Sequence, residues 1–277
     1  MSLLFNKIQQ LNHDNPGWVH GLWHNPEKRL GRFFWMSPGQ VALARLYGEV
    51  MVLDVSEGRN LYKMHLTTIV VVDGDNRTRN IAYCLSERQD TDTFVWIFQY
   101  VARVINRQPA VTKLGAVFSD RDHAIAAAIK KVWPNVFHGI CLWHLHENLA
   151  KNLSSLLTSS LQLFMHDFGE TYRMGSPETF EVAWEQLLSR WPSAVQYLQY
   201  YIYPDREKWA WAWVGSRFTV GLRTTGRVEC EHKNYNLLGL GSHSTLNEVF
   251  DTLCRQAERQ KDNDVEKKLQ VFLPPLS

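Results

Sequence analysis

Two β-rich runs joined by a tight-turn signal dominate the first third of the chain. Residues 66–73 (LTTIVVVD) are largely β-branched and lead into Asp73 and Gly74, a pair typical of hairpin turns. Residues 79–86 (RNIAYCLS) alternate between apolar and polar side chains, as a returning strand does. Residues 49–56 (EVMVLDVS) form a further short apolar run. The sequence therefore predicts three strands in an antiparallel meander before any crossover helix.

Strand and helix signals alternate after the meander. Residues 94–105 carry one apolar stripe at helical spacing, residues 113–120 predict a buried strand, and residues 122–133 predict a helix that stops before a proline. Residues 136–143 predict a fifth strand, with a helix from about residue 146. This order predicts an α/β fold with a mixed five-stranded sheet flanked by helices.

The 277 residues divide by pattern into four parts. Residues 1–48 are expected to be an irregular or helical covering segment, and residues 49–150 the first part of the core. Residues 151–222 lack strand signals and are rich in Leu, Trp and Tyr, which predicts an all-helical insertion. Residues 223–277 are expected to be C-terminal helices that complete the core.

Composition excludes several classes of protein. No apolar run approaches the roughly 20 residues that span a bilayer, so no membrane partner is expected. Thirty Lys and Arg against 28 Asp and Glu give a net charge of +2, so nucleic acid could bind only through a local basic patch. The four cysteines form no CxxC pair, which excludes a disulfide scaffold and a zinc ribbon.

Two acids, Asp54 and Asp120, close apolar runs that should be buried. A single acid at a strand end usually caps the next loop. Two carboxylates about 4 Å apart would repel each other by roughly 4 kcal/mol at an effective dielectric near 20, unless a cation lay between them. An oxygen-only site of this kind suits Mg²⁺ or Mn²⁺.

A third acid would complete a site for two metal ions. Glu229 and Glu231 lie where a late helix is predicted to begin. They differ by about 200° around a helix, so only one of them can face a given site. The helical pattern leaves open which one does.

Three sequence blocks, in order, carry a resemblance to a known family. Their most specific residues are Leu53, Asp54 and Asn60; Phe118, Ser119, Asp120, Asp122, Ala124, Ile125, Trp133, Pro134, Cys141, Trp143 and His144; and Thr224, Thr225, Gly226, Arg227, Val228 and Glu229. The chain resembles the catalytic domain of Mutator-like element (MULE) DNA transposases, which belong to the DDE superfamily. A departure follows the first acid, where Val55 to Arg59 replace a Thr-Tyr-Lys-Thr-Asn-like stretch.

The resemblance implies an RNase H-like fold with the helical insertion before the last catalytic helix. It selects Asp54, Asp120 and Glu229 as catalytic acids and as ligands of two Mg²⁺ or Mn²⁺ ions. The implied activity is DNA strand cleavage and joining, with transposon ends and target DNA as partners, in the nucleus. A homodimer is left open.

Cys141 and His144 have zinc-ligand chemistry, but four ligands are not evident, so structural zinc is not favoured. They converge only if a turn or helix begins between them. The resemblance places this pair near the active site, where it would position DNA or metal; Cys141 as a small buried apolar residue is the alternative.

Four basic residues, Arg217, Arg223, Arg227 and Lys233, surround the third acid in sequence. They are candidates for phosphate contacts, which would give binding independent of DNA sequence. A solvated charged face is an equally good interpretation of the same residues.

The zinc modules that flank the core of complete transposases of this group have no counterpart here, so a truncated transposase core is expected. The alternative is a domesticated, non-catalytic transcriptional regulator, as in the plant far-red-response factors that resemble these transposases. A structure-selective nuclease of the same fold is a third hypothesis.

Overall fold

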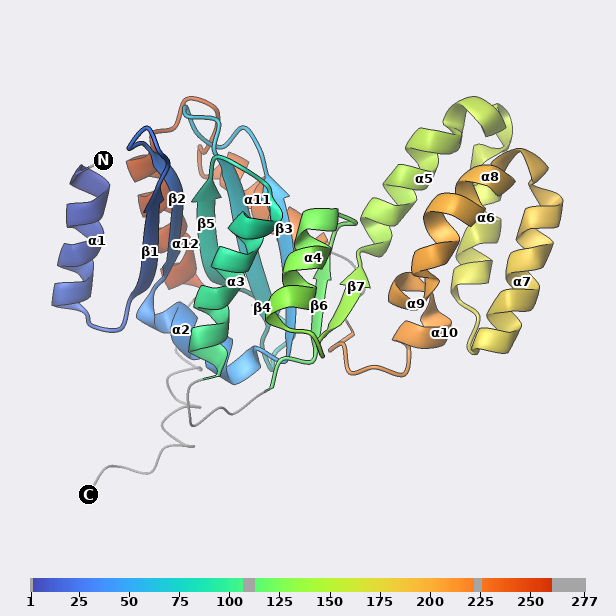
Figure 1. The fold of residues 1–277 in the computed structure, drawn as a ribbon, viewed down its shortest axis with the longest axis horizontal. Coiled ribbons are helices and arrows are strands. Elements are labelled where there is room, and N and C mark those ends of the chain that lie inside the picture. Colours follow the sequence, from blue (N-terminus) through green and yellow to red (C-terminus); the bar gives the residue numbers. More distant parts are fainter. Residues whose placement is uncertain (1, 107–112, 222–225, 261–277) are drawn as a thin grey trace, which may run out of the picture.

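The computed structural model describes residues 2–106, 113–221 and 226–260. Figure 1 shows a central sheet with helices on both faces and a separate block of helices beside its β7 edge. The strands are β1 (Val19–His24), β2 (Leu30–Met36), β3 (Val50–Ser56), β4 (His65–Val72), β5 (Thr78–Ser86), β6 (Ala116–Ser119) and β7 (Phe137–Ile140). The longer helices are α1 (Ser2–Asp14), α2 (Pro38–Tyr47), α3 (Thr91–Ile105), α4 (His123–Val132), α5 (Leu142–Leu157), α6 (Leu161–Tyr172), α7 (Pro177–Arg190), α11 (Gly226–Leu237) and α12 (Leu246–Arg259).

The described strands form one seven-stranded sheet in the order β1-β2-β5-β4-β3-β6-β7. The first five strands in this order pair antiparallel, and β3, β6 and β7 pair parallel. The parallel pairs bring the carboxyl ends of β3, β6 and β7 to the same edge of the sheet. The predicted mixed α/β sheet is confirmed, while its RNase H-like classification stays a prediction.

The predicted strand count of five is wrong, because β1 and β2 come from the segment that was expected to be irregular or helical. Strand β2 pairs with β5 and carries β1 on its other side. Phe33 and Trp35 pack on one face of the sheet while Phe34 and Met36 pack on the other. A strand buried on both faces shows no apolar–polar alternation, so the period-two signal is missing from the sequence.

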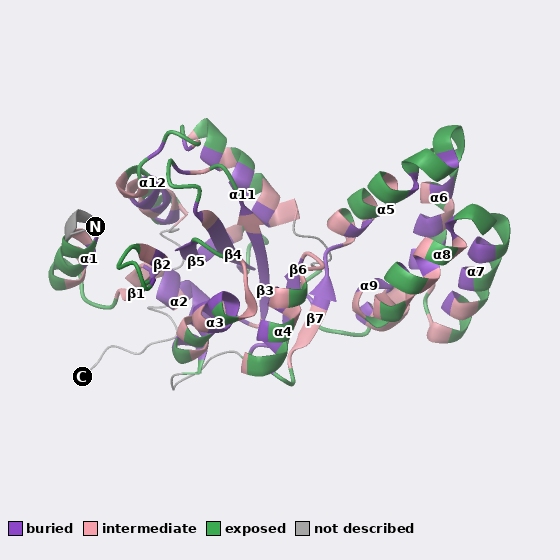
Figure 2. Cartoon of the chain, turned by 45° about the horizontal axis from the view of Figure 1, so that its top comes forward, coloured by how far each residue is buried: buried purple, intermediate pink, exposed green. Residues whose placement is uncertain are grey.

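Helices cover both faces of the sheet, and the strands alternate between two cores. Met51 and Leu53 of β3 pack with the helices α2, α3 and α4, whereas Val50 and Val52 pack with Val228 of α11. Helices α1 and α12 cover the same face as α11, toward the β1 end of the sheet. Figure 2 shows the buried strands at the centre and exposed residues on the outer helix surfaces. By this alternation, Asp54 belongs to the face covered by α11.

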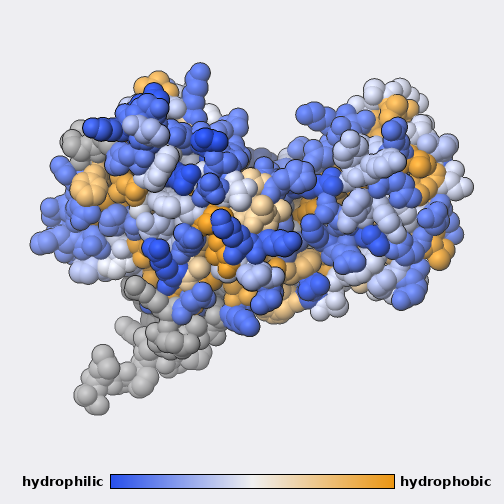
Figure 3. Space-filling model, viewed as in Figure 1, coloured by the Kyte–Doolittle hydropathy of each residue, from blue (hydrophilic) through white to orange (hydrophobic). Residues whose placement is uncertain are grey.

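A helical block with a core of its own begins at Leu142, before the start expected at residue 151, because α5 belongs to this block. The block contains the long helices α5, α6 and α7, which are followed in the chain by the short helices α8 (Val195–Tyr197), α9 (Arg206–Trp209) and α10 (Trp211–Val214). Phe168, Phe180, Trp184 and Trp209 pack together inside this block. The face seen in Figure 3 is largely hydrophilic and is notched between the sheet and the helical block. Among the described helices, none combines the length and apolarity needed to cross a membrane.

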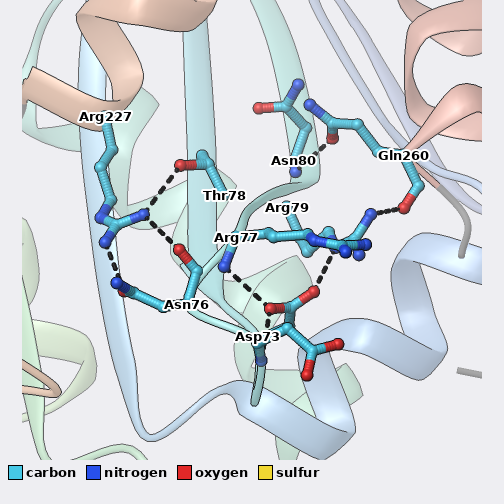
Figure 4. Close-up of polar contacts among 9 residues, drawn as sticks. Asp73, Asn76, Arg77, Thr78, Arg79, Asn80, Arg227 and Gln260 are labelled. Atoms are coloured by element: carbon cyan, nitrogen blue, oxygen red, sulfur yellow. Dashed lines mark hydrogen bonds and ion pairs between the residues drawn. The ribbon is translucent and has the colours of Figure 1, made fainter. Parts of the chain in front are cut away.

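A polar network closes the β4–β5 turn and ties two distant helices to it (Figure 4). Asp73 accepts hydrogen bonds from the backbone N–H groups of Asp75 and Arg77 at 2.9 Å each, and from Arg79 Nε at 2.6 Å. Arg79 also donates to the backbone carbonyl of Gln260, just after α12. The Asp73–Arg79 ion pair is buried, so each charge depends on the other.

Replacing Arg79 with Met leaves the Asp73 side chain, 3% exposed, without its charge partner. We expect the free energy of unfolding to fall by about 3 kcal/mol in urea denaturation, because the orphaned carboxylate stays buried. The control is Arg88→Met: the Arg88 side chain is 70% exposed, and its ion pair with Asp90 should contribute less than about 1 kcal/mol. Equal losses in the two variants would contradict the structural role of the buried pair.

Candidate acidic site at the carboxyl edge of the sheet

Asp54 and Asp120 meet at the edge where the parallel strands end. Asp54 lies near the end of β3, and Asp120 directly follows β6, its parallel neighbour. Val52 of β3 pairs with Phe118 of β6, and Asp54 and Asp120 each follow the paired residue of their own strand by the same number of residues. The sheet thus places the two acids side by side, as their strand-end positions predict.

Helix α11 packs across β3 and supplies the third carboxylate. Glu229 lies in the first turn of α11, with one of its carboxylate oxygens 3.8 Å from His144 Nε2. Its negative charge acts on Asp54. Asp54, Asp120 and Glu229 are therefore brought to one site, whose chemical role stays a prediction.

Glu231 faces away from this site, which decides the choice that helical geometry left open. Its carboxylate is buried and accepts hydrogen bonds from Asn80 Nδ2 at 2.7 Å, Gln256 Nε2 at 2.6 Å and Gln260 Nε2 at 3.0 Å. These donors lie on β5, on α12 and directly after α12. Glu231 thus fastens α11 to the sheet and to α12, while Glu229 remains at the acidic site.

The electrostatics of the acidic site favour a bound cation. Burial raises the pKa of Asp54 to about 6, with the charges of Asp120 and Glu229 adding to the rise against the opposing effects of His144 and the Val55 N–H. Burial, reinforced by the charge of Asp122, also raises the pKa of Asp120. Carboxylates perturbed in this direction gain from any positive charge placed between them.

His144 supplies part of that positive charge. Burial opposes its protonation, but its contact with Cys141 and the charges of Asp54 and Asp120 raise the pKa of His144 to about 9. The imidazole is therefore protonated at neutral pH, beside the acids. Because a single imidazolium faces three carboxylates, the site remains rich in negative charge.

His232, one helical turn after Glu229, also contacts Asp54. Its Nδ1 lies 3.5 Å from Asp54 Oδ2. Burial, together with the charges of Arg59 and His144, lowers the pKa of His232 to about 4, so this contact joins a neutral ring to the carboxyl group. The spacing of three residues from Glu229 is the sequence signal that predicts His232 on the same side of α11.

The donor atoms fit a hard divalent cation. Asp120 Oδ1 is buried and has no hydrogen-bond partner within the described part of the chain. A buried carboxylate oxygen without a donor is costly unless another positive group reaches it. With Asp54 and Glu229 nearby, the oxygen ligands suit Mg²⁺ or Mn²⁺.

Cys141 and His144 converge because α5 begins between them. Cys141 is the N-cap of α5, and the helix starts at Leu142, earlier than the sequence predicts. One ligand atom each from Cys141, His144 and Glu229 lies within 4.8 Å of the others. The pair therefore borders the acidic site.

The predicted phosphate contacts do not form one cluster. Arg227 donates to the carbonyl and side-chain oxygens of Asn76, in the β4–β5 turn (Figure 4). Arg217 lies 4.3 Å from the ring centre of Phe137, at the start of β7 and thus at the opposite edge of the sheet from the acids. Lys233 is exposed on α11, and Arg223 lies outside the described residues.

Known proteins resemble this chain over the region that holds the site. Residues 50–148 match the MULE transposase domain family. From Arabidopsis thaliana, FAR1-RELATED SEQUENCE 5 is 23% identical over 99% of this chain and 34% of its own length. FAR-RED IMPAIRED RESPONSE 1 is 20% identical over 82% of this chain and 27% of its own length. FAR1-RELATED SEQUENCE 4 is 23% identical over 85% of this chain and 31% of its own length.

The chain spans about a third of the length of these curated relatives. The matched domain contains Asp54, Asp120, Cys141 and His144, while Glu229 lies beyond it. Over residues 50–148, the chain is similar to the MULE transposase domain family.

Proposed function

We propose that this chain is the transposase-like part of a nuclear, DNA-associated transcriptional regulator derived from a MULE transposase. The observation that carries the proposal is the similarity to the far-red-response relatives. It extends over 99% of the chain for FAR1-RELATED SEQUENCE 5, and so includes the helical block as well as the matched domain. Plant far-red-response factors serve as regulators, and this chain would share their role in acting on DNA.

The fold suits such a role because it offers a rigid body with its polar site at one edge. The strand order β5-β4-β3-β6-β7, with its antiparallel strands followed by parallel ones, supports an RNase H-like interpretation. Exposed Lys233 lies on α11, the helix that also carries Glu229. DNA phosphates approaching this edge would meet both the basic side chain and any cation held by the acids.

A second candidate function is metal-dependent phosphoryl transfer on DNA, in the manner of a transposase. The specific observation in its favour is the convergence of Asp54, Asp120 and Glu229, with an unsatisfied oxygen on Asp120. These residues would hold two Mg²⁺ ions, which supply an activated nucleophile and stabilise the leaving oxygen. The protein's own contribution would be to keep the acids fixed and the DNA phosphate in line.

Regulation and catalysis differ in their need for the acids. In cells, we expect the protein to occupy genomic DNA and to change transcription of adjacent reporter genes, and Asp54→Asn and Asp120→Asn to leave both unchanged. Chromatin immunoprecipitation and reporter transcription measure these effects. Absence of DNA occupancy by the unaltered protein would contradict the regulator.

Purified protein with Mg²⁺ tests the second candidate directly. Under the regulator proposal, duplex DNA that flanks the gene and arbitrary duplex DNA should both stay uncut. Mg²⁺-dependent strand cleavage that is abolished by Asp54→Asn and Asp120→Asn, but kept by the exposed-acid control Asp92→Asn, would establish the catalytic alternative. Cutting of flanking DNA alone would indicate a transposase, and cutting of any duplex a general nuclease.

Cation binding at the acids should depend on pH. The pKa of Asp54 is raised to about 6, so its carboxyl group is protonated below that pH and a proton competes there with the cation. We expect Mn²⁺ to raise the melting temperature at pH 7.5 and to have little effect at pH 5, because a ligand stabilises only the state that binds it. Asp54→Asn should remove the gain at pH 7.5, whereas Asp92→Asn should preserve it. A gain that does not change between the two pH values would refute a cation held by Asp54.

A further inference from the structure

Cys141, His144 and Glu229 bring sulfur, nitrogen and oxygen donors to one point beside the acidic site. Their ligand atoms all lie within 4.8 Å of one another. We propose that these three residues form a site for Zn²⁺ that shares Glu229 with the acidic site, with a fourth coordination position left open for water or a phosphate oxygen. The proposal concerns metal binding alone and does not depend on whether the protein cuts DNA.

The start of α5 explains why two of the ligands meet. Cys141 is the N-cap residue and His144 is the third residue of the helix. The two side chains meet across the first turn of the helix, where the Cys141 thiol contacts the His144 imidazole. Cys141 does not act as a cap here, since its side chain makes no capping hydrogen bond with the backbone of α5. Its sulfur is directed instead toward the imidazole and the carboxylate.

The third ligand comes from another part of the chain and closes the site. Glu229 lies in the first turn of α11, and its Oε1 is 3.8 Å from His144 Nε2. Donor atoms at this spacing can surround one ion after small side-chain rotations, because Zn–N and Zn–O bonds are about 2.0–2.2 Å and Zn–S bonds about 2.3 Å long. Both helices direct their positive ends toward the Cys141 sulfur and the Glu229 carboxylate.

The ligand types select the metal. A thiolate and an imidazole are poor ligands for Mg²⁺, which prefers oxygen, whereas Zn²⁺ accepts sulfur, nitrogen and oxygen together. Three protein ligands with an open position are typical of zinc sites that bind a further molecule. The adjacent carboxylates of Asp54 and Asp120 make the surroundings favourable for a dication.

Cobalt provides a spectroscopic probe for this site. The purified full chain, freed of metal with a chelator, is titrated with Co²⁺ while absorption is recorded. We expect visible bands of tetrahedral Co²⁺ and a thiolate-to-Co²⁺ band corresponding to a single sulfur ligand, all lost when Zn²⁺ is added. Cys141→Ser should remove the thiolate band, and Glu229→Gln should weaken Co²⁺ binding more than about tenfold, the cost of losing even an outer partner of a ligand.

Matched controls come from neighbouring residues. Cys230→Ser changes an exposed thiol next to Glu229, and His146→Asn changes a histidine on α5 whose ring packs against Phe168. Both should bind Co²⁺ like the unaltered protein. Circular dichroism shows whether Cys141→Ser has folded, and Glu229→Gln keeps the test decisive if it has not, because Glu229 lies outside the packed core.

The absence of a thiolate band in the unaltered protein would overturn the zinc site. So would a band that persists in Cys141→Ser, or one that disappears in Cys230→Ser. Unchanged Co²⁺ affinity in Glu229→Gln would likewise exclude the proposed ligand set. Failure of the regulator or nuclease assays would leave these spectra unaffected, so the two proposals fail independently.

Discussion

The gathering of three carboxylates, one buried and two partly buried, at one edge of the sheet is the constraint around which this site is arranged. Asp54 and Asp120 reach the same edge because β3 and β6 run parallel, and α11 adds Glu229 from the covering layer. Burial raises the pKa of Asp54, and the charges of Asp120 and Glu229 add to the rise. Protonated His144 offsets part of it, and a divalent cation would offset the rest.

The surrounding structure holds α11 in register with that edge. Val228 packs in the apolar core beneath the sheet, Glu231 accepts hydrogen bonds from side chains on β5 and α12, and Arg227 donates hydrogen bonds to the β4–β5 turn. Neighbouring residues of α11 thus have three different roles: packing in the apolar core, hydrogen bonding to the sheet and α12, and contributing to the acidic site. Because these attachments do not involve a metal, the site would keep its shape in a protein that does not cleave DNA.

Because the attachments of α11 do not depend on a metal, the presence of the acidic site is compatible with a regulator as well as with a transposase. The similarity to FAR1-RELATED SEQUENCE 5 extends over 99% of the chain, and so includes both the sheet and the helical block. The convergence of Asp54, Asp120 and Glu229 does not by itself make the protein an enzyme. The same residues could bind a cation, and the same scaffold could bind DNA, without any cleavage. The position of the acids therefore bears on what the site can bind, whereas the similarity to far-red-response relatives bears on the kind of protein in which the scaffold is used.

The sequence by itself determined the strands β3 to β7, the helical block and the two acids at strand ends, because these depend on local periodicity and turn chemistry. Tertiary structure decided the rest. β2 joined the sheet through aromatic side chains buried on both faces, which leave no alternating pattern, and β1 pairs with β2 at the edge. Glu229 rather than Glu231 faces the acids, because the hydrogen bonds of Glu231 lead to Asn80, Gln256 and Gln260, far away in sequence. Cys141 and His144 meet because a helix starts between them, and packing of distant elements determines that boundary.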